Sequence, residues 1–415
     1  MGVPHKNPPL PIRPTSATAY STSAPSPEDT AKSAVASFSL VLGGPLYNFL
    51  QRVGVVRFSL PNVLRRIAAS VAITWLPLLL LSLKDGLAFG HQVKIPLLSD
   101  FSVYGRFLLA VPLLLVAEVV IDPAIRMALG EFVEGHIVPE HELPAFTSVL
   151  KSTQHLRDSW VPEVLLFALA FFPVFLLQRG WTSVSSWHTT AQGLTHAGWW
   201  FAILSTPILR FLIYRWTFRY FVWSILLWRI GRLDLVLMPT HPDHAAGLNF
   251  LGLAQKRFGL LFCALGCAFA GQVADRVAFL GIPLMSFKFL MSGFIVLSVV
   301  LALLPLTLLW SKLAKVRKAG LLEYGRLVGT YTASFDRKWV HAAERPSEQL
   351  LGTSDIQSLA DIGNSFAFVD AMTVVPITKR LVLQLTAQAA APLLPVIVLG
   401  TPTPELVKAI MKMVT

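Results

Sequence analysis

Charged side chains are scarce in this chain of 415 residues. Asp, Glu, Lys and Arg make up 14% of it, whereas soluble domains carry about 25%. With 54% hydrophobic residues, a water-soluble fold would expose apolar surface that aggregates. The composition therefore excludes a soluble protein and predicts a chain whose hydrophobic surface faces lipid.

Cysteine is almost absent, and the familiar enzyme motifs are missing altogether. The two cysteines, Cys263 and Cys267, both lie inside an apolar run, which excludes a disulfide framework. The sequence contains no Gly-rich phosphate loop, dinucleotide fingerprint, nucleophile elbow or HExxH zinc motif. None of these enzyme classes is supported, and we predict no cofactor apart from the divalent metal considered below.

The longest uninterrupted apolar run covers residues 289–310. These 22 residues contain no charged side chain, and a helix of that length crosses the ~30 Å hydrocarbon core of a bilayer. Lys312, Lys315, Arg317 and Lys318 follow directly, and a basic cluster marks the end of a span that stays in the cytoplasm. The run predicts an integral membrane protein.

Apolar runs of similar character recur along the chain. We predict an all-α fold, a polytopic transmembrane helical bundle of about seven spans with a helical cytoplasmic portion. One run, at 199–228, would extend about 45 Å as a helix, so it either protrudes from the membrane or breaks and turns along the surface. The predicted spans are 67–83, 107–121 (with a start near 101 as the alternative), 164–177, 199–228, 258–273, 289–310 and 381–399.

Basic residues are distributed unevenly between the two sides that these spans define. With the N-terminus inside, the cytoplasmic segments hold 24 Lys and Arg and the outer segments hold 8. Although the inner segments are also longer, the positive-inside rule predicts this bias, and we expect a cytoplasmic N-terminus and an external C-terminus. A net charge of +12 located beside apolar runs indicates a bilayer with anionic lipids as the partner, and no nucleic acid.

The segments outside the spans differ in composition. Residues 1–34 are rich in Pro, Ser, Thr and Ala, which predicts a disordered N-terminal tail. Residues 35–66 mix apolar residues with arginines and are predicted to lie in the membrane interface, as is a short amphipathic helix at 400–415. The transmembrane helical domain at 67–399 is predicted to carry cytoplasmic loops at 122–160, 229–257 and 311–380.

Four ionisable residues, Glu118, Arg210, Arg215 and Arg219, lie within the predicted spans or their apolar continuation. A charge in a spanning helix costs about 2.5–3.5 kcal/mol on insertion scales, so it tends to have a partner or a task. We predict a pair between Glu118 and Arg210, which would line a polar pathway. A structural anchor is the alternative, because long side chains near helix ends reach the interface, and the sequence leaves both open.

His241, Asp243 and His244 form the densest group of potential metal ligands, within the sequence PTHPDH. Two imidazoles and a carboxylate suit a divalent metal such as zinc. The alternative is a tight turn shaped by Pro239 and Pro242, with Asp243 capping the segment that follows. The turn is favoured, because isolated ligand pairs are common in sequences.

A repeat of small residues runs along the fifth predicted span. Gly259, Cys263, Cys267 and Gly271 recur every four residues. Such a face lets another helix approach closely, and we predict a helix-packing face rather than a redox or metal site.

Two sequence motifs resemble those of a known family. They are WRIGRLDLVLMPTHPDHAAGLNFLG at 228–252 and LLGTSDIQSLADIGNSF at 350–366, with VVPITKR further on. They are similar to motifs in a family of uncharacterised multi-pass bacterial inner-membrane proteins, and the similarity extends from about residue 40 to the C-terminus. The resemblance implies a bacterial inner membrane, and it brings no activity, substrate or catalytic residue.

Two classes of function fit these observations. The leading hypothesis is a non-enzymatic membrane protein that transports a small solute or ion, or that anchors a cytoplasmic partner at the membrane. The alternative is a metal-dependent membrane enzyme whose site, at the cytoplasmic face, uses the PTHPDH residues with Asp355 or Asp361. Neither a substrate nor an oligomeric state follows from the sequence, and a homo-oligomer is compatible with it.

Overall fold

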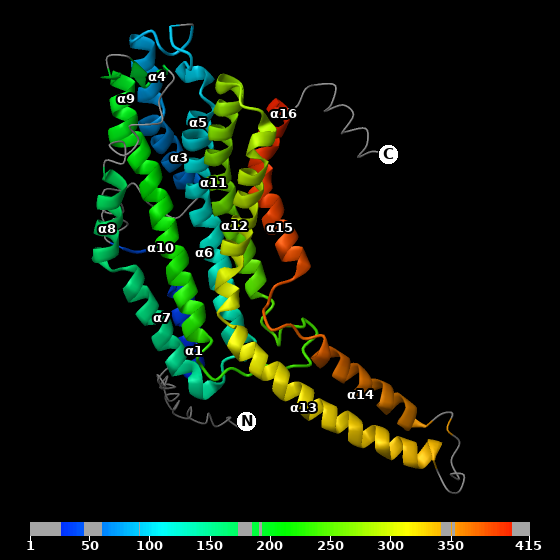
Figure 1. The fold of residues 1–415 in the computed structure, drawn as a ribbon. Helices are drawn as coiled ribbons and strands as arrows, with labels where there is room; N and C mark the ends of the chain where they lie inside the picture. Colours follow the sequence, from blue (N-terminus) through cyan, green and yellow to red (C-terminus); the bar gives the residue numbers. More distant parts are fainter. Residues whose placement is uncertain are drawn as a thin grey trace, which may run out of the picture.

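The computed structural model describes residues 26–44, 60–90, 92–172, 185–190, 193–341, 350 and 353–400. This part of the chain is almost entirely helical and forms a bundle from which one helical hairpin projects (Figure 1). The predicted all-α polytopic bundle is confirmed, since six helices in the described residues are long and apolar enough to cross a membrane. They are Val63–Lys84, Phe101–Glu134, His196–Ile230, Leu251–Leu280, Leu284–Thr307 and Lys379–Gly400.

The first two spanning segments are longer than the sequence predicted. Helices α3 (Leu60–Thr74) and α4 (Leu76–Lys84) form the first, which therefore begins before residue 67. The second combines α5 (Phe101–Val103), a π-helical stretch η2 (Tyr104–Ala110) and α6 (Val111–Glu134). The prediction that 122 begins a cytoplasmic loop is wrong, because Asp122 is fully buried on α6 and has partners inside the protein.

The third predicted span, 164–177, is only partly described. Helix α7 (Leu143–Arg157) leads into α8 (Trp160–Phe171), whose 12 residues extend about 18 Å, too short to cross a bilayer. Residues after 172 in this run lie outside the described part of the chain. Even so, α6 ends at one end of the bundle and α9 starts at the other, so the chain between them runs from one end to the other (Figure 1).

The fourth span is a single continuous helix. Helix α9 (His196–Trp200), the π-helical η5 (Phe201–Ser205) and α10 (Thr206–Ile230) join without a break. Their 35 residues extend about 52 Å, so the helix protrudes beyond the hydrocarbon core. Of the two alternatives left by the sequence, protrusion is therefore the one observed.

Helix α11 (Leu251–Leu280) lies in the middle of the bundle. It contacts α6 and η2 on one side and α12 (Lys288–Thr307) and α15 (Lys379–Ala390) on the other. Helix α16 (Leu394–Gly400) continues α15 after a short 3-10 turn. The predicted interfacial helix at 400–415 lies outside the described residues except for Gly400, which ends α16.

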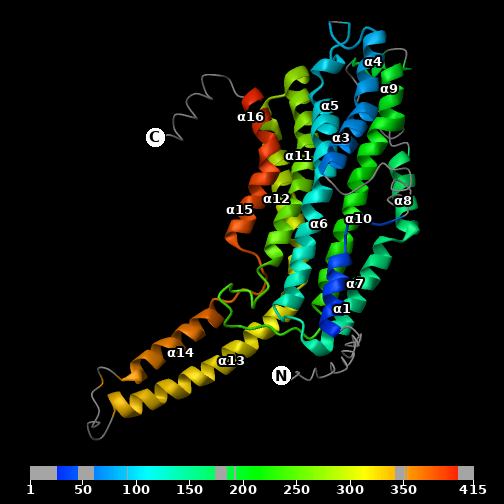
Figure 2. The same cartoon turned by 180° about the vertical axis from the view of Figure 1, so that it is seen from behind.

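Two helices project from one end of the bundle. Helix α13 (Trp310–Phe335) and α14 (Ser354–Asp370) pack against each other as an antiparallel hairpin, which we call the arm (Figures 1 and 2). We call the end that carries it the arm end. The helical portion predicted at 311–380 therefore has the form of an extended hairpin rather than a compact domain.

The N-terminal predictions need correction. Helix α1 (Pro27–Ser37) packs against α7 and α6, so residues 27–34 are not a disordered tail. Residues 38–44, which we call the plug, enter the bundle with Phe38, Leu40 and Val41 buried, and do not lie in the interface. Composition alone missed both segments, because their polar atoms are satisfied by residues far along the chain.

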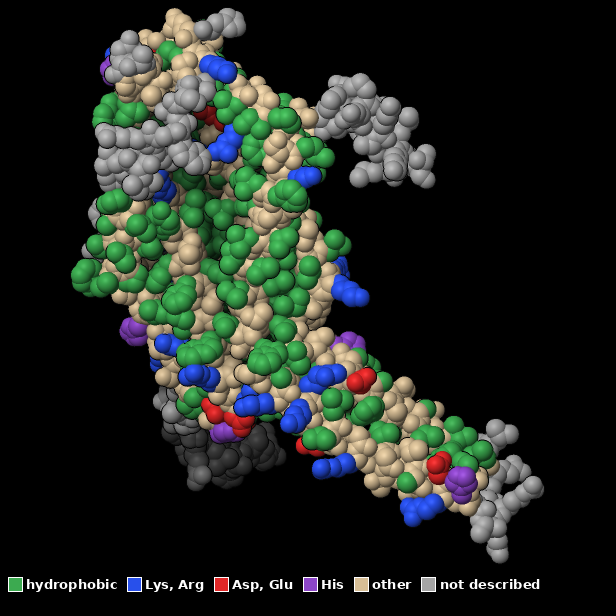
Figure 3. Space-filling view, in the orientation of Figure 1, with side chains coloured by type: hydrophobic (Ala, Val, Ile, Leu, Met, Phe, Trp, Pro, Cys, Tyr) green, Lys and Arg blue, Asp and Glu red, His purple; other side chains and the backbone are tan. Residues whose placement is uncertain are grey.

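The surface matches this arrangement. Hydrophobic side chains cover the visible face of the bundle, and Lys and Arg gather where the arm leaves it (Figure 3). At the opposite end, a small antiparallel hairpin pairs β1 (Thr189–Thr190) with β2 (Gly193–Leu194). The apolar band with a basic border is the pattern expected of a protein that spans a membrane.

Candidate functional site

Glu118 lies on α6 with only 3% of its surface exposed, and three arginines surround it. Its Oε1 accepts a hydrogen bond of 2.9 Å from Nη1 of Arg219 and lies 3.9 Å from Nη1 of Arg215. Its Oε2 lies 2.6 Å from Nη2 of Arg66. The predicted pair with Arg210 is wrong, since the arginines five and nine residues further along α10 take that place.

The spacing along α10 explains this arrangement. Arg215 and Arg219 are four residues apart and therefore share one helix face, which is turned toward α6. Trp216, between them, donates from Nε1 to the Leu114 carbonyl at 2.9 Å. The Arg219 guanidinium also lies 5.1 Å from the centre of the Trp216 ring, a favourable cation–π distance. These contacts fix α10 against α6 at the level of Glu118.

A small cavity adjoins the arginines. Its volume is about 20 Å³, enough for one water-sized particle. Glu163 on α8 lies on its wall, within electrostatic range of Arg215. Arg66, Arg215 and Arg219 approach Glu118, and Glu163 lies near Arg215, so these five groups of the described part of the chain together carry an excess of one positive charge. The residues lining the cavity are Leu40, Gly43, Gly44, Arg157, Glu163, Leu166, Phe211, Arg215, Phe218 and Arg219.

The plug is held by this same part of the bundle. Asp122 Oδ1 accepts hydrogen bonds from Ser39 Oγ at 2.7 Å, from the Leu40 amide at 2.7 Å and from the Val41 amide at 3.2 Å. The Val41 carbonyl accepts from Nη2 of Arg219 at 3.0 Å. Arg219 thus binds both Glu118 and the plug, so the N-terminal segment closes the cluster from the arm end.

A second polar cluster lies near the opposite end. Asp275 on α11 accepts from the Phe101 and Ser102 amides at 2.8 and 3.0 Å, at the start of the second spanning segment. Asp100 accepts from Trp187 Nε1 at 2.8 Å. Trp187 is 1% exposed, so it anchors the loop before α9 inside the protein.

Arg210 belongs to this second cluster. It lies within electrostatic range of Arg106 on η2, which also interacts with Asp100 and Asp275. The Arg106 guanidinium lies 5.9 Å from the ring centre of Phe201. Neither Arg106 nor Arg66 was singled out from the sequence, because Arg66 directly precedes the first predicted span, and Arg106 belongs to the second only if that span starts near residue 101, as it does in the structure. The signal in both cases is an arginine directly before an apolar run.

The PTHPDH segment forms a turn. Asp243 Oδ1 accepts from the Ala245 and Gly247 amides at 2.8 and 3.1 Å, and its Oδ2 accepts from the Asn249 amide at 3.0 Å. His241 Nδ1 lies 2.8 Å from Asp243 Oδ1. Partial burial raises the pKa of Asp243, but the backbone donors and His241 outweigh it, so its pKa lies below the ordinary value.

His244 points elsewhere. Its ring stacks on Phe368 of the arm at a centroid distance of 5.7 Å, and its carbonyl accepts from the Thr373 amide at 2.8 Å. Asp355 lies 13 positions before Phe368 on α14, about 20 Å away along the helix, where Lys338 binds it at 2.9 Å. Among the described residues, no group of three His, Cys, Asp or Glu is placed to hold a metal ion.

The small-residue repeat on α11 meets two different neighbours. A Cβ on Gly259 would collide with Gln388 of α15, whereas one on Gly271 would stand 2.5 Å from the Phe101 carbonyl oxygen. The Cys267 carbonyl touches the position where Gly105 lacks a side chain. Cys263, one turn before Cys267, is half-buried. The predicted packing face therefore exists, but it is divided between α15 and the start of the second spanning segment.

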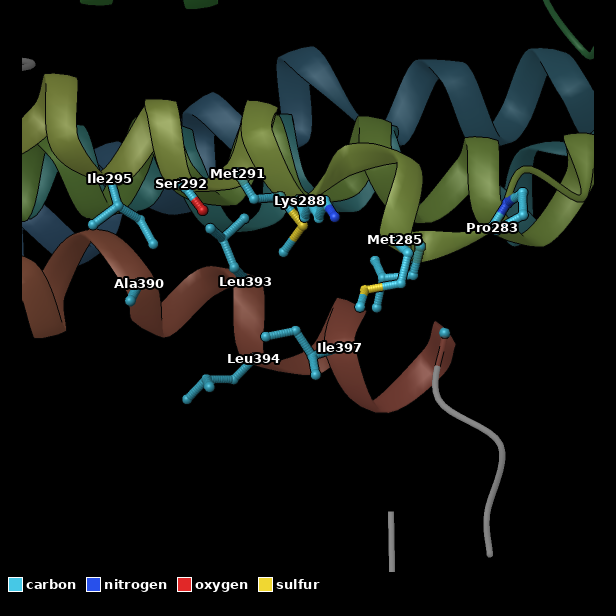
Figure 4. Close-up of a pocket in the computed structure, with 12 residues that line it drawn as sticks. Pro283, Met285, Lys288, Met291, Ser292, Ile295, Ala390, Leu393, Leu394 and Ile397 are labelled. Carbon is cyan, nitrogen blue, oxygen red and sulfur yellow. The ribbon is translucent and has the colours of Figure 1, made fainter. Parts of the chain in front are cut away.

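Another groove is apolar. It lies between α12 and the α15–α16 segment, with a volume of about 620 Å³ (Figure 4). Met285, Met291, Leu393 and Ile397 are among the residues on its walls, and Lys288 is the one charged residue among the described ones that line it. Because the groove is formed by spanning helices, hydrocarbon from the bilayer fits it better than a polar substrate.

Six spanning helices with charged clusters buried among them define the class of this chain: it is a polytopic α-helical membrane protein. Comparison with protein families, with curated proteins and with solved structures gave no match.

Proposed function

We propose that the protein moves a small anion across the membrane and that the Glu118 cluster is its binding site. The observation that carries this proposal is the excess of one positive charge among Arg66, Arg215, Arg219, Glu118 and Glu163, next to a cavity. An unbalanced charge at membrane depth costs about 2.5–3.5 kcal/mol on insertion scales. A monovalent anion in the cavity would balance it.

The position of the second cluster supports a route rather than an isolated site. Arg106 lies 12 residues before Glu118 in the same spanning segment, which is about 18 Å along the helix. Arg210 and Arg219 lie at the corresponding levels of α10. An anion that leaves one cluster would therefore meet a second pair of guanidinium groups nearer the opposite end.

The test is anion flux into liposomes that contain the purified protein. We expect flux above that of empty liposomes, and we expect Arg215→Gln to reduce it strongly, because Arg215 makes the loosest contact with Glu118 and faces the cavity. Arg210→Gln should reduce it as well. Arg229→Gln is the matched control, since Arg229 lies in the last turn of the same helix, is half-buried, does not line the cavity and binds Ser152.

Two results would count against this function. Wild-type protein that gives no flux above empty liposomes, for halides or for larger monovalent anions, would exclude it. Normal flux in folded Arg215→Gln and Arg210→Gln would remove these residues from the mechanism and return the arginines to the role of structural anchors.

A second candidate function is a membrane-anchored partner of a cytoplasmic protein, and the arm favours it. Leu322 and Leu327 on α13 and Ile356 on α14 are exposed, and across both arm helices only Leu313, Gly320 and Val369 are buried. An arm that binds a partner should be protected from protease in unwashed membranes and cleaved after high-salt washing. Equal cleavage in both samples would contradict this role, and the flux assay is independent of it.

We also propose that the membrane is the bacterial inner membrane and that the arm and the N-terminal helix face the cytoplasm. The gathering of Lys and Arg at the arm end supports this orientation (Figure 3). The family resemblance of the two motifs, at 228–252 and 350–366, supports the bacterial setting.

A further inference from the structure

A charged groove lies at the arm end, between the first turns of two spanning helices. Helices α11 and α15 pack side by side, and the groove between their first residues has a volume of about 430 Å³. Both helices start at the boundary between the apolar bundle and the arm (Figure 2). The residues lining the groove are Asn249, Phe250, Gly252, Leu253, Lys256, Thr378, Arg380, Leu381 and Gln384.

The groove carries positive charge without a matching carboxylate. Lys256 comes from α11 and Arg380 from α15, so the two cations stand on opposite walls. No Asp or Glu lines the groove, and neither cation has an ion-pair partner among the described residues. Asn249 and Gln384 add amide donors. The chemistry of the site therefore suits a phosphate group, which accepts hydrogen bonds from several donors.

The surroundings of the groove are those of a lipid headgroup site. Leu253 is 64% exposed and Leu383, beside the groove on α15, is 70% exposed. Both belong to helices that cross the membrane, so these side chains face acyl chains. Phe250 and Leu381 line the groove as well. A ligand with a phosphate at the boundary and hydrocarbon below it would satisfy both halves of this surface.

We propose that this groove binds the headgroup of an anionic phospholipid from the leaflet on the arm side, with Lys256 and Arg380 on its phosphate. The apolar groove between α12 and α16 differs from it, because Lys288 is the only charged residue there and its walls suit chains rather than headgroups (Figure 4).

The experiment titrates the purified full-length chain in detergent with phosphatidylglycerol or phosphatidylcholine and counts bound lipids by native mass spectrometry. We expect one phosphatidylglycerol to bind more tightly than phosphatidylcholine. Lys256→Ala/Arg380→Ala should weaken it about 30-fold, because each basic side chain near an anionic surface contributes about 1 kcal/mol and about 1.4 kcal/mol is tenfold. The conservative variant Lys256→Arg/Arg380→Lys should retain most of the binding.

Lys315→Ala/Lys318→Ala is the matched control, since both lysines are exposed on α13 outside the groove. Circular dichroism and gel filtration establish that each variant is folded. Equal affinity for the two lipids, or equal loss in the groove and control variants, would overturn the proposal. Inorganic phosphate that displaces the lipid and binds equally well without it would overturn the assignment to lipid and indicate a soluble anion.

Discussion

Glu118 stands among more cations than it can neutralise. Arg66, Arg215 and Arg219 come from two different spanning segments, and their guanidinium nitrogens lie 2.6, 3.9 and 2.9 Å from this one carboxylate. Because the cluster is buried, removing one of its charges is costly for stability: the partner that remains inside the protein cannot be solvated by water. Glu118 thus holds two spanning segments together in the arm-side half of the bundle and also contributes to the charge beside the cavity.

Replacing Glu118 by Gln should lower the free energy of unfolding by about 3–5 kcal/mol, the cost of breaking a buried ion pair. The measurement is denaturant unfolding in detergent micelles, followed by tryptophan fluorescence. Glu131→Gln, exposed on the same helix, should change little. A loss for Glu118→Gln below about 1 kcal/mol, the value of a surface ion pair, would contradict the buried cluster.

Asp243 gives a pH prediction outside the membrane. Its pKa is lowered in the folded protein, so the carboxylate stabilises the PTHPDH turn above the ordinary pKa of about 3.9 and loses that contribution as pH falls toward the folded value. Amide exchange at Ala245, Gly247 and Asn249 should therefore accelerate, relative to intrinsic rates, as pH falls below about 4. Asp243→Asn should exchange fast throughout. A pH-independent wild type would contradict the role of this carboxylate.

At the scale of elements, α11 organises the bundle through close contacts at its glycines. Gly271 allows the Phe101 backbone to approach, and Asp275, one turn later, then caps the amides of Phe101 and Ser102. The same helix meets α15 at Gly259. Small side chains thus set the distance between α11 and its neighbouring spans. Helix association in a membrane depends on such packing, because lipid provides no hydrophobic driving force.

Gly271→Ala should destabilise the bundle by about 1–3 kcal/mol, the usual cost of overpacking, because its Cβ would stand 2.5 Å from the Phe101 oxygen. Thermal unfolding in detergent measures this. The matched control is Gly293→Ala on α12, where an added Cβ meets nothing within 4 Å. Equal melting temperatures for the two variants would show that the second spanning segment moves away from the added methyl group without loss of stability.

Some elements were predictable because a single local signal decides them. The run at 289–310 predicted α12 closely, and two prolines predicted the turn at His241–Asp243. The ends of α3 and α6 were not predictable, because Arg66 and Asp122 look like surface charges until their partners, Glu118 and the plug, are known. The site was predictable only in part. Glu118 and the arginines of α10 are conspicuous because they interrupt apolar runs, whereas Arg66 and Arg106 lie just outside such runs.

At the scale of the whole molecule, the two ends of the bundle differ. Helix α1 and the arm lie at one end, and α16 finishes at the other (Figure 2). The seven predicted spans, an odd number, likewise put the start and the end of the chain on opposite sides, and the distribution of Lys and Arg predicts which side is the inside. The proposed cytoplasmic orientation assigns the arm end to the inside.

Cysteine labelling tests the orientation. In a chain with Cys263 and Cys267 replaced by Ala, an impermeant maleimide should react with Lys318→Cys only in inverted membrane vesicles. Lys94→Cys, exposed in the loop between α4 and α5 at the opposite end, should react only in right-side-out vesicles. The reverse pattern would place the arm outside the cell.

The contacts of the plug also constrain the order in which the protein assembles during translation. Its binding groups, Asp122 on α6 and Arg219 on α10, are synthesised long after residues 38–44 leave the ribosome. During translation the plug can therefore bind Asp122 once α6 is in place, but its contact with Arg219 forms only after more than half of the chain has been synthesised. Insertion of α10 completes the binding site of the plug, so the arm-side half of the bundle is finished late in biogenesis, and a chain truncated before Arg219 lacks the guanidinium group that binds the Val41 carbonyl.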